Sequence, residues 1–397
     1  MKIIYVTASL PYGTTEVFAI PEVREFIRRG HQVRLVPMMS RTQVPHSDAE
    51  PFLPITEYAP LLSGPVLRAM PEFARAPRAA TGALSRVLKG QKRLMRKKNL
   101  GSFPKALWLA QFARRWGADH IHAYWASVAA TAAMVAGEVS GVPWSFTAHR
   151  WDIAEPNAFR AKLESARFAR FISQDGLELA REVAGPQLDE KAAIIRMGVP
   201  LSEGEVRRTT PPAGVQLRLI CTGTLIPRKG QRFLLEAVAR LKAQGIDVHV
   251  SFAGAGGRLG ELQEQADTLH IADRLTFLGN VDHNALLTQY AEGCYDAFIL
   301  PSLHEGISVA LIEAMSYGLP VIATDVGGTR ELLNAGAGQL IAPSDVEGIV
   351  EAITEFVRNE PARLEQGRRG QQRVMAEYDI RGVVDALEAR FEAHTIR

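Results

Sequence analysis

The sequence predicts an α/β protein made of two doubly wound, Rossmann-like domains. Short apolar runs alternate with segments of helical period through both halves, the pattern of parallel strands connected by helices. A stretch without apolar period, 202–214, holds two prolines and separates the halves. A length of 397 residues fits two domains, each with its own core. In such a pair we expect the domains to face each other across a ligand cleft at the carboxyl ends of the strands.

The amino half follows this pattern on both sides of one long interruption. A helix at 15–29 is expected because apolar residues recur at helical period and Gly30 ends the run. The alanine-rich run 123–136 is too short to span a membrane and is expected to be a buried helix. Strands are expected at 3–7, 33–36, 120–123, 144–148, 170–173 and 193–196.

The carboxyl half repeats the pattern without a long interruption. Strands are expected at 218–221, 248–253, 275–278, 297–300 and 321–323. Helices are expected at 231–244, 259–269, 284–292, 308–317 and, with an amphipathic pattern, 380–393. The expected organisation is therefore an amino-terminal domain 1–201, a linker 202–214, a carboxyl-terminal domain 215–377 and a final segment 378–397.

Composition excludes several classes of protein. With 46 basic and 43 acidic residues the net charge is +3, which argues against a strongly basic nucleic-acid scaffold. Residues 1–200 carry 27 basic and 17 acidic residues and the remainder carries 19 and 26, so the first half is expected to meet an anionic partner. Two cysteines, Cys221 and Cys294, give neither a disulfide framework nor a zinc site, and the apolar run at the amino terminus is too short for a signal peptide. We expect a cytoplasmic protein.

The most informative segment follows the strand at 297–300. Backbone N–H groups of Gly306, Ile307 and Ser308 would point out of a helix start, which is a ready site for phosphate. Glu305 lies just before this helix and Glu313 lies in its second turn, so each carboxylate can accept hydrogen bonds from a pair of sugar hydroxyls. The alternative is that both are solvated glutamates at a helix end.

Three further strands of the carboxyl half end in glycine-containing turns. The first turn, GTLIPRKG at 223–230, brings two cations to the expected phosphate position, although alone it could be an exposed basic turn. The others, AGAGG at 253–257 and FLGNV at 277–281, leave room for a ligand. The candidate binding residues in these turns are Gly223, Thr224, Arg228, Lys229, Gly254 and Gly279.

Together these motifs resemble glycosyltransferase family 4, whose members have the GT-B fold. The Glu305…Glu313 spacing, GLPVIATDVGG at 318–328 and the PRKG turn carry the resemblance, which covers about 170 residues well. In the amino half TAH at 147–149 and MGV at 197–199 agree more loosely. The segment 15–30, with Glu16, Phe18 and Glu22, looks like the branch that assembles exopolysaccharides, and so does HIHAYWAS, which begins at His120.

The resemblance implies a retaining transfer of sugar from a UDP- or GDP-linked donor to a hydroxyl of a sugar or lipid-linked acceptor, with no cofactor. It assigns the ribose to Glu313, the donor sugar to Glu305, the pyrophosphate to Lys229, and a place near the donor sugar to His149. It also implies that the last helix crosses back to the amino-terminal domain. Thr224 stands where the family usually has arginine, and Arg228 is the candidate substitute.

Three histidines are candidates for a catalytic or a metal-binding role. His149, at the end of an expected strand, is a candidate catalytic residue, and Asp152 is either its partner or a helix cap. His120 and His122 alternate on a strand, but no third ligand is evident, so a structural role is favoured. Because no D-x-D motif occurs, we expect a metal-independent enzyme.

Two alternatives remain beside the transferase. A sugar-nucleotide epimerase of similar fold would need no acceptor. A non-catalytic sugar-nucleotide-binding subunit would tolerate Thr224, although the set Glu305, Glu313 and Lys229 argues against it.

A basic segment falls in the long interruption of the amino half. Residues 68–98 contain ten basic residues and one acidic residue, Glu72, and the densest part is KGQKRLMRKK at 89–98. With Leu84, Val87, Leu88, Leu94 and Met95 beside it, the segment predicts an amphipathic surface that docks peripherally on anionic lipid. The alternative is a solvated basic helix. Nucleic acid is disfavoured, because no aromatic residue interleaves 89–98.

Overall fold

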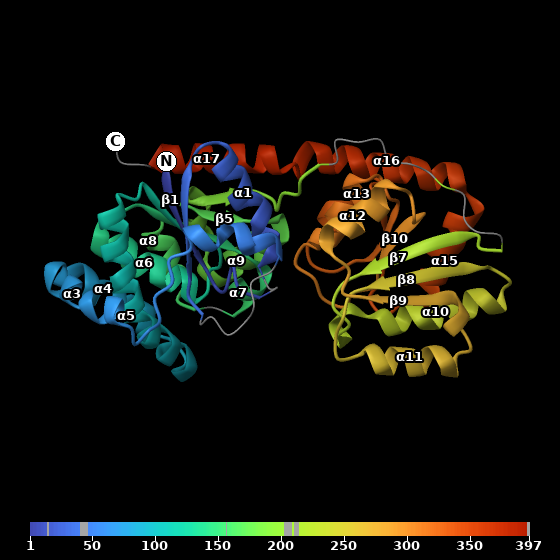
Figure 1. Cartoon of the computed structure of the whole chain (residues 1–397), viewed down its shortest axis with the longest axis horizontal. Coiled ribbons are helices and arrows are strands. Elements are labelled where there is room, and N and C mark those ends of the chain that lie inside the picture. The colour runs from blue at the N-terminus through green and yellow to red at the C-terminus, as the bar shows by residue number, and fades with distance from the viewer. Residues whose placement is uncertain (14–15, 40–46, 156, 202–208, 210–213, 395–397) are drawn as a thin grey trace. The chain divides into compact units, whose positions relative to one another are not determined.

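The computed structural model describes residues 1–397 except 14–15, 40–46, 156, 202–208, 210–213 and 395–397 (Figure 1). The chain forms two compact units. The amino-terminal unit comprises 1–198 and 380–397, and the carboxyl-terminal unit comprises 199–379. Most of the expected linker, 202–214, lies outside the described residues.

The amino-terminal unit contains a parallel sheet of six strands among its described residues, in the order β2-β1-β3-β4-β5-β6. Strand order reverses beside β1, which confirms the doubly wound topology. β1, β2, β5 and β6 begin one residue before the expected positions, and β5 and β6 also end two residues before their expected ends. The strands are β1 (Lys2–Thr7), β2 (Gln32–Pro37), β3 (His120–Ala123), β4 (Trp144–Ala148), β5 (Ala169–Phe171) and β6 (Ala192–Ile194).

Helices cover this sheet. The helix expected from 15 begins later, at α1 (Ile20–Arg28), because Pro21 suits the first turn of a helix and a short 3-10 turn at Val17–Ala19 precedes it. α6 (Val128–Ser140) is buried along nearly its whole length, as expected. The final helix α17 (Ile380–His394) packs on this unit, with Phe391 5.7 Å from Phe26 between ring centroids. The other helices around the sheet are α7 (Arg150–Ala154), α8 (Phe159–Ser165) and α9 (Gln174–Ala184).

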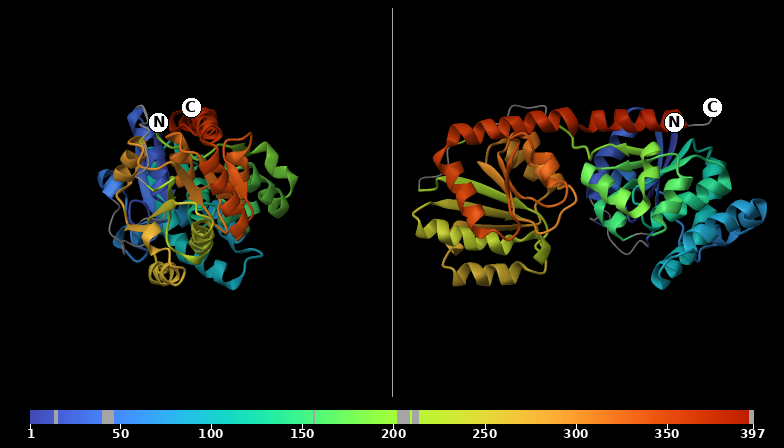
Figure 2. Two further views of the ribbon diagram at one scale, coloured as in Figure 1. Left: turned by 90° about the vertical axis from the view of Figure 1, so that its right-hand side faces the viewer. Right: turned by 180° about the vertical axis from the view of Figure 1, so that it is seen from behind.

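The long interruption between β2 and β3 contains four α-helices among its described residues, of which the sequence analysis offered only a basic helix within 68–98, as an alternative. α5 packs against α6, while its first turns and the end of α4 extend away from the sheet (Figure 2). A stacked ladder of Trp108, Phe112 and Trp116 runs along α5 at successive fourth residues. The inserted helices are α2 (Gly64–Arg68), α3 (Pro71–Arg75), α4 (Pro77–Leu88) and α5 (Arg93–Trp116).

The carboxyl-terminal unit contains a second parallel sheet, with the order β12-β11-β10-β7-β8-β9 among the described residues. No helix or strand between 324 and 379 was predicted from the sequence, and the short edge strand β12 is among these elements. The strands are β7 (Leu217–Thr222), β8 (Val248–Ala253), β9 (Leu275–Gly279), β10 (Ala297–Leu300), β11 (Val321–Thr324) and β12 (Gln339–Ile341). The helices are α10 (Gln231–Ala243), α11 (Leu259–Thr268), α12 (His283–Ala291), α13 (Val309–Ser316), α14 (Thr329–Leu333), α15 (Val346–Arg358) and α16 (Glu360–Glu377).

Each unit has its own core on both faces of its sheet. Both cysteines are free thiols, Cys221 buried on β7 and Cys294 half-buried. In the part of the chain that the structure describes, no helix combines the length and the apolar character needed to cross a membrane.

Candidate functional site

The loop between β10 and α13 is joined to the turn after β7 by an ion pair. Oε1 of Glu305 accepts hydrogen bonds from Nζ of Lys229 and from the hydroxyl of Ser302, both at 2.6 Å. The two charged side chains are only 15% and 10% exposed for Lys229 and Glu305, so the pair is little screened by water. The sequence therefore predicted both residues, and the structure adds that they bind each other.

Close backbone packing fixes the turn that carries Lys229. A short 3-10 turn at Pro227–Lys229 ends at Gly230, whose φ is +67°. A Cβ at Gly230 would lie 2.0 Å from the carbonyl oxygen of Pro301, so only glycine allows this approach. The N–H of Leu303 donates to the carbonyl of Arg228 at 2.7 Å. The cationic turn and the loop of Glu305 thus form one rigid piece.

The start of α13 has the features of a phosphate site. Among the described residues no group accepts a hydrogen bond from the backbone N–H of Gly306, Ile307 or Ser308. Nothing lies within 4 Å of the place where a Cβ of Gly306 would stand, and the N–H of Gly328 holds the Gly306 carbonyl at 2.7 Å. Three N–H donors therefore lie at the positive end of the eight-residue helix α13.

Glu313, on the second turn of α13, accepts a hydrogen bond from Nε2 of His283 at 2.8 Å. Its side chain is 16% exposed, and that of His283 is 39% exposed. Nearby, the hydroxyl of Tyr290 lies 3.1 Å from Oγ1 of Thr222. Burial raises the pKa of Tyr290, and the negative charge of Glu313 raises it further, so the phenol stays protonated. Glu313 can therefore accept hydroxyl hydrogens in a partly dry setting.

The glycines at the strand ends have different roles. Gly254 was expected to leave space for a ligand, but its missing side chain is used for packing, because a Cβ there would lie 2.2 Å from the carbonyl oxygen of Gly223. Gly279 instead borders open space, and its carbonyl accepts the Gly254 N–H at 2.7 Å. Thr224 is exposed, and its carbonyl accepts a hydrogen bond from the side chain of Gln231.

His149 lies in the amino-terminal unit, directly after β4. It is 6% exposed, and within the described chain neither ring nitrogen makes a hydrogen bond. Nδ1 is 3.8 Å from Oδ2 of Asp152, beyond hydrogen-bond distance. The carboxylate of Asp152 instead accepts the backbone N–H of His149 and of Ala126, both at 2.7 Å. Of the two roles considered for Asp152, the structure favours the cap.

The strand histidines are held as structural residues. Nε2 of His120 and Nδ1 of His122 both contact the hydroxyl of Ser145, at 2.7 and 2.8 Å, and Nε2 of His122 contacts Thr147 at 2.9 Å. Burial lowers the pKa of His122, and it lowers that of His120 to about 3. Both imidazoles are therefore neutral.

Three residues near these sites were not predicted to take part. Ser302 lies two residues beyond β10, His283 begins a helix after a strand end, and Trp125, within HIHAYWAS, lies two residues beyond β3. The signal for His283 and Trp125 was their place after a strand, where the carboxyl edge of a parallel sheet presents ligand-binding groups.

Comparisons with known proteins agree with this picture. Residues 204–373 match the family model described as glycosyl transferases group 1. The putative colanic acid biosynthesis glycosyltransferase WcaL of Salmonella typhimurium is 34% identical over 186 residues, 44% of this chain and 44% of that protein. The putative teichuronic acid biosynthesis glycosyltransferase TuaC of Bacillus subtilis is 27% identical over 293 residues, 70% and 71% of the two chains. The match with WcaL thus spans less than half of that relative's length.

Solved structures share the whole architecture. Anabaena HepE in complex with UDP superposes with a TM-score of 0.70 over 99% of this chain and all of that one, at 18% identity. The lipopolysaccharide outer core galactosyltransferase WaaB superposes with a TM-score of 0.69 over 99% of both chains, at 16% identity. At such identities the likeness establishes the fold, which is GT-B with two Rossmann-like units.

Proposed function

We propose that the chain is a group 1 glycosyl transferase, the family whose model residues 204–373 match, and that it moves a sugar from a nucleoside diphosphate sugar to a hydroxyl acceptor. One observation supports the proposal above the others. Three unpartnered N–H groups at 306–308 lie at the helix start that follows the Lys229–Glu305 pair. Such a combination of N–H donors and a cation matches a diphosphate.

Binding of the donor would reorganise the pair. A pyrophosphate competes with Glu305 for the ammonium group of Lys229, and the released carboxylate then accepts hydroxyls of the donor sugar. Glu313, oriented by His283 at 2.8 Å, takes the two ribose hydroxyls. The donor site therefore switches from an internal ion pair to ligand contacts without burying an unpaired charge.

The proposed sugar transfer needs neither a metal ion nor a nucleophilic side chain of the protein. The acceptor oxygen bonds to the anomeric carbon on the face that the leaving group vacates, while the bond from that carbon to the β-phosphate oxygen breaks. The acceptor proton passes to the departing phosphate, and the anomeric configuration is retained. Helix N–H groups and Lys229 stabilise the charge that develops on the diphosphate.

The first test is nucleotide binding by calorimetry. Glu313→Ala should weaken binding of UDP or GDP by roughly 1.5–3 kcal/mol, the range for a hydrogen bond to a charged group. Glu305→Ala should affect the intact nucleotide-sugar more than the free nucleotide. Glu351→Ala, which removes an exposed carboxylate of the same unit, is the control and should change neither. Unchanged affinity for the free nucleotide in Glu313→Ala would show that the ribose assignment is wrong. We propose to test UDP first, because HepE was solved with UDP.

Donor chemistry separates the alternatives. An epimerase converts the nucleotide-sugar in the absence of acceptor, so an epimer in incubations of donor alone would overturn the transferase proposal. A non-catalytic subunit binds the donor but never releases nucleoside diphosphate, with any acceptor tried. Nucleotide release that depends on acceptor is the result we expect.

His149 is proposed to contact the donor sugar in the transition state. Both of its ring nitrogens are unpartnered within the described chain, which supports a contact with substrate. His149→Ala should lower kcat and kcat/KM together. Because the ring is buried against three aromatic side chains, the variant should also melt earlier, so its kinetics are compared well below its thermal midpoint. If His149→Ala kept the full kcat, the role of His149 would be structural only.

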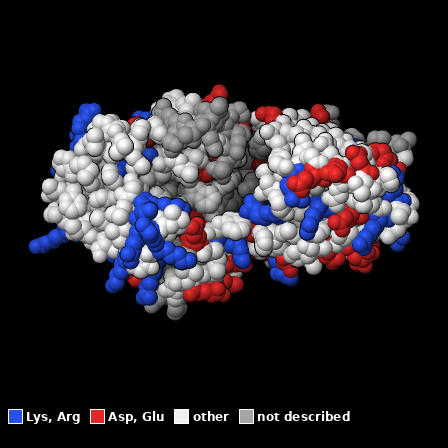
Figure 3. Space-filling model, turned by 90° about the horizontal axis from the view of Figure 1, so that it is seen from below, with Lys and Arg blue, Asp and Glu red and all other residues white. Residues whose placement is uncertain are grey.

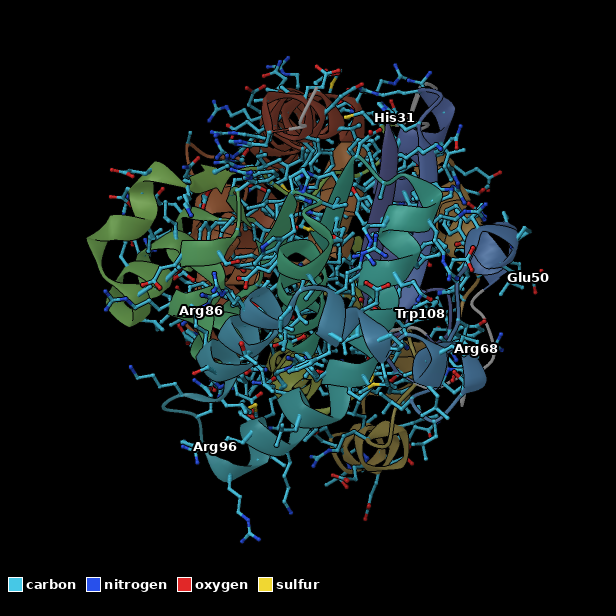
Figure 4. All side chains as sticks on the ribbon, turned by 90° about the vertical axis from the view of Figure 1, so that its left-hand side faces the viewer. His31, Glu50, Arg68, Arg86, Arg96 and Trp108 are labelled. Atoms are coloured by element: carbon cyan, nitrogen blue, oxygen red, sulfur yellow. The ribbon has the colours of Figure 1, made fainter. Side chains whose placement is uncertain are left out.

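We propose that the acceptor is lipid-linked and that a basic surface on the amino-terminal unit docks peripherally on anionic membranes. Figure 3 shows Lys and Arg side chains gathered on this unit, and Figure 4 shows Arg96 at the tip of α5. The basic surface comprises the exposed residues Lys89, Lys92, Arg93, Arg96, Lys97 and Lys98. Within the described chain none of these six side chains makes an ion pair, so all six are available to phosphate headgroups.

The apolar part of this surface differs from the expectation. Val87 is fully buried and Met95 is 8% exposed, so both belong to the core and not to a lipid-facing stripe. Leu94 is 60% exposed and Leu100 is 49% exposed, and they supply the apolar contacts of α5. A groove of about 970 Å³ runs between the α4–α5 turn and α8, with Lys89 and Lys92 among its lining residues. Its mixed lining suits the phosphate end of a lipid-linked acceptor.

Vesicle co-sedimentation tests the docking. Each basic residue near an anionic surface contributes about 1 kcal/mol, so removing five should abolish binding to vesicles that contain anionic lipid. The variant replaces Lys92, Arg93, Arg96, Lys97 and Lys98 by glutamine. The charge-matched control should bind vesicles as wild type does. It replaces, likewise by glutamine, the exposed residues Arg232, Arg240, Arg358, Arg368 and Arg369. Equal binding to neutral and anionic vesicles, or binding to neither, would refute docking and leave the transferase proposal intact.

A further inference from the structure

A buried carboxylate occupies a backbone cradle at the end of β1. Oε1 of Glu16 accepts the N–H of Ala8 at 2.8 Å. Oε2 accepts the N–H groups of Ser9 and Leu10 at 2.5 and 2.8 Å, and the Ser9 hydroxyl at 3.0 Å. Glu16 is 2% exposed, so four donors from three successive residues replace its water shell.

The same carboxylate also holds an aromatic ring of another segment. Oε1 of Glu16 accepts Nε1–H of Trp125 at 2.6 Å, across 109 positions of the chain. The Trp125 ring lies over the His149 ring with centroids 4.2 Å apart and planes at 34°. Phe18, two residues after Glu16, packs edge-on against both rings, at 5.9 Å from Trp125 and 5.8 Å from His149. Glu16 therefore fixes the aromatic wall that contacts His149.

The imidazole of His149 is oriented by these rings. Neither of its nitrogens is hydrogen-bonded within the described residues: Asp152 accepts the backbone N–H of His149, and its other carboxylate oxygen lies 3.8 Å from Nδ1. In the usual arrangement of a reactive histidine, a hydrogen bond at one nitrogen fixes the ring. Here Trp125, Tyr124 and Phe18 contact the ring from different directions. Trp125 is the nearest of these rings, so a shift of Trp125 would change the orientation of the imidazole.

From this geometry we infer that Glu16 is a positioning residue: it locks the β1 loop and Trp125 so that the His149 ring is held ready for the substrate. The inference rests on the proposed role of His149 in sugar transfer. A glutamine cannot replace Glu16, because its amide offers one acceptor oxygen and turns an NH2 group towards N–H donors. A role limited to closing the β1 loop would stabilise the fold but would not couple to His149.

The experiment combines NMR with a double-mutant cycle. In Glu16→Gln and in Trp125→Phe, which keeps a ring but loses the indole N–H, the ring resonances of His149 should move. The control Glu25→Gln alters a carboxylate of the same unit that pairs with Arg28 and Arg29, and should leave those resonances in place. Glu16→Gln should also lower kcat by about tenfold to a hundredfold, the usual result of a small misplacement. In the His149→Ala background the same change should cause no further loss.

Two results would overturn the inference: unmoved His149 resonances in both variants, or a loss of kcat on Glu16→Gln that multiplies with that of His149→Ala. If Glu16→Gln does not fold, Trp125→Phe decides by the same two readouts. The resonances are measured without substrate, so they separate this inference from the proposed function. A chain that transfers no sugar but shows the shifts refutes the function and not the positioning contact.

Discussion

Replacing Gly230 by alanine is expected to damage stability and donor binding together, because Gly230 lies between Lys229 and the loop of Glu305. Its φ of +67° is unfavourable for any residue with a Cβ, at a cost of about 1–2 kcal/mol. Alanine loses less backbone entropy on folding, which offsets about 0.4–1 kcal/mol. The Cβ would also lie 2.0 Å from the Pro301 oxygen, and such overpacking costs roughly 1–3 kcal/mol more. The net destabilisation is about 2–4 kcal/mol.

Gly245 is a matched control in the same unit. Its φ is +74°, but nothing lies within 4 Å of the position of its Cβ. Gly245→Ala therefore has the conformational cost of a positive φ but no steric contact of the kind that Gly230→Ala makes with Pro301. The net destabilisation is about 1 kcal/mol. For a unit of this size 1 kcal/mol shifts the thermal midpoint by roughly 2–4 °C, so Gly230→Ala should lower it several-fold further than Gly245→Ala.

Calorimetry with UDP or GDP completes the comparison. Relief of the contact with Pro301 must move the turn of Lys229 away from the loop of Glu305, so Gly230→Ala should lose nucleotide affinity while Gly245→Ala keeps it. Equal melting shifts and equal affinities in the two variants would refute the reasoning, since the contact with Pro301 would then have no energetic consequence.

Three further outcomes follow from buried groups. Glu22→Gln leaves the fully buried Arg170 without its partner at 2.6 Å, and should lower the free energy of unfolding by roughly 3–5 kcal/mol in thermal or urea denaturation. Hydrogen bonds from Arg28 and Arg29 lower the pKa of Glu25 from 4.5 to about 2. Because the folded-state pKa is the lower one, this stabilisation is present above pH 4.5 and is lost as the pH falls towards 2, so Glu25→Gln should lose less stability than wild type in melts across that window. Burial raises the pKa of Cys221 to about 12, so iodoacetamide at pH 8 should not modify it in the folded protein but should do so in urea, as mass spectrometry would report.

Local patterns in the sequence were enough for the two sheets. Parallel strands are buried on both faces and read as short apolar runs, so β1, β4, β8 and β10 could be located within a residue or two. Elements without that signal were missed. The insertion before β3 was interpreted as one amphipathic or solvated basic segment and not as separate helices, and the edge strand β12 has only three residues, of which one is buried.

Some features of the candidate site could likewise be predicted from the sequence, and others could not. Glu305, Gly306 and Glu313 could be read from the sequence, because they belong to one loop and one helix whose spacing is local. The contacts that these groups make could not be predicted, since Lys229, itself a predicted site residue, is 76 positions from Glu305 and His283 is 30 positions from Glu313.

The sequence also could not predict which apolar residues of the basic insertion are buried. Val87 and Leu94 are both apolar residues beside a basic run, yet one is fully buried and the other is 60% exposed. The choice depends on which helix face meets the rest of the unit. The sequence by itself thus determined which segments become strands and which strand ends bear chemical groups. Only the tertiary structure decided which groups meet, because each contact depends on how separate elements pack and not on the spacing within one of them.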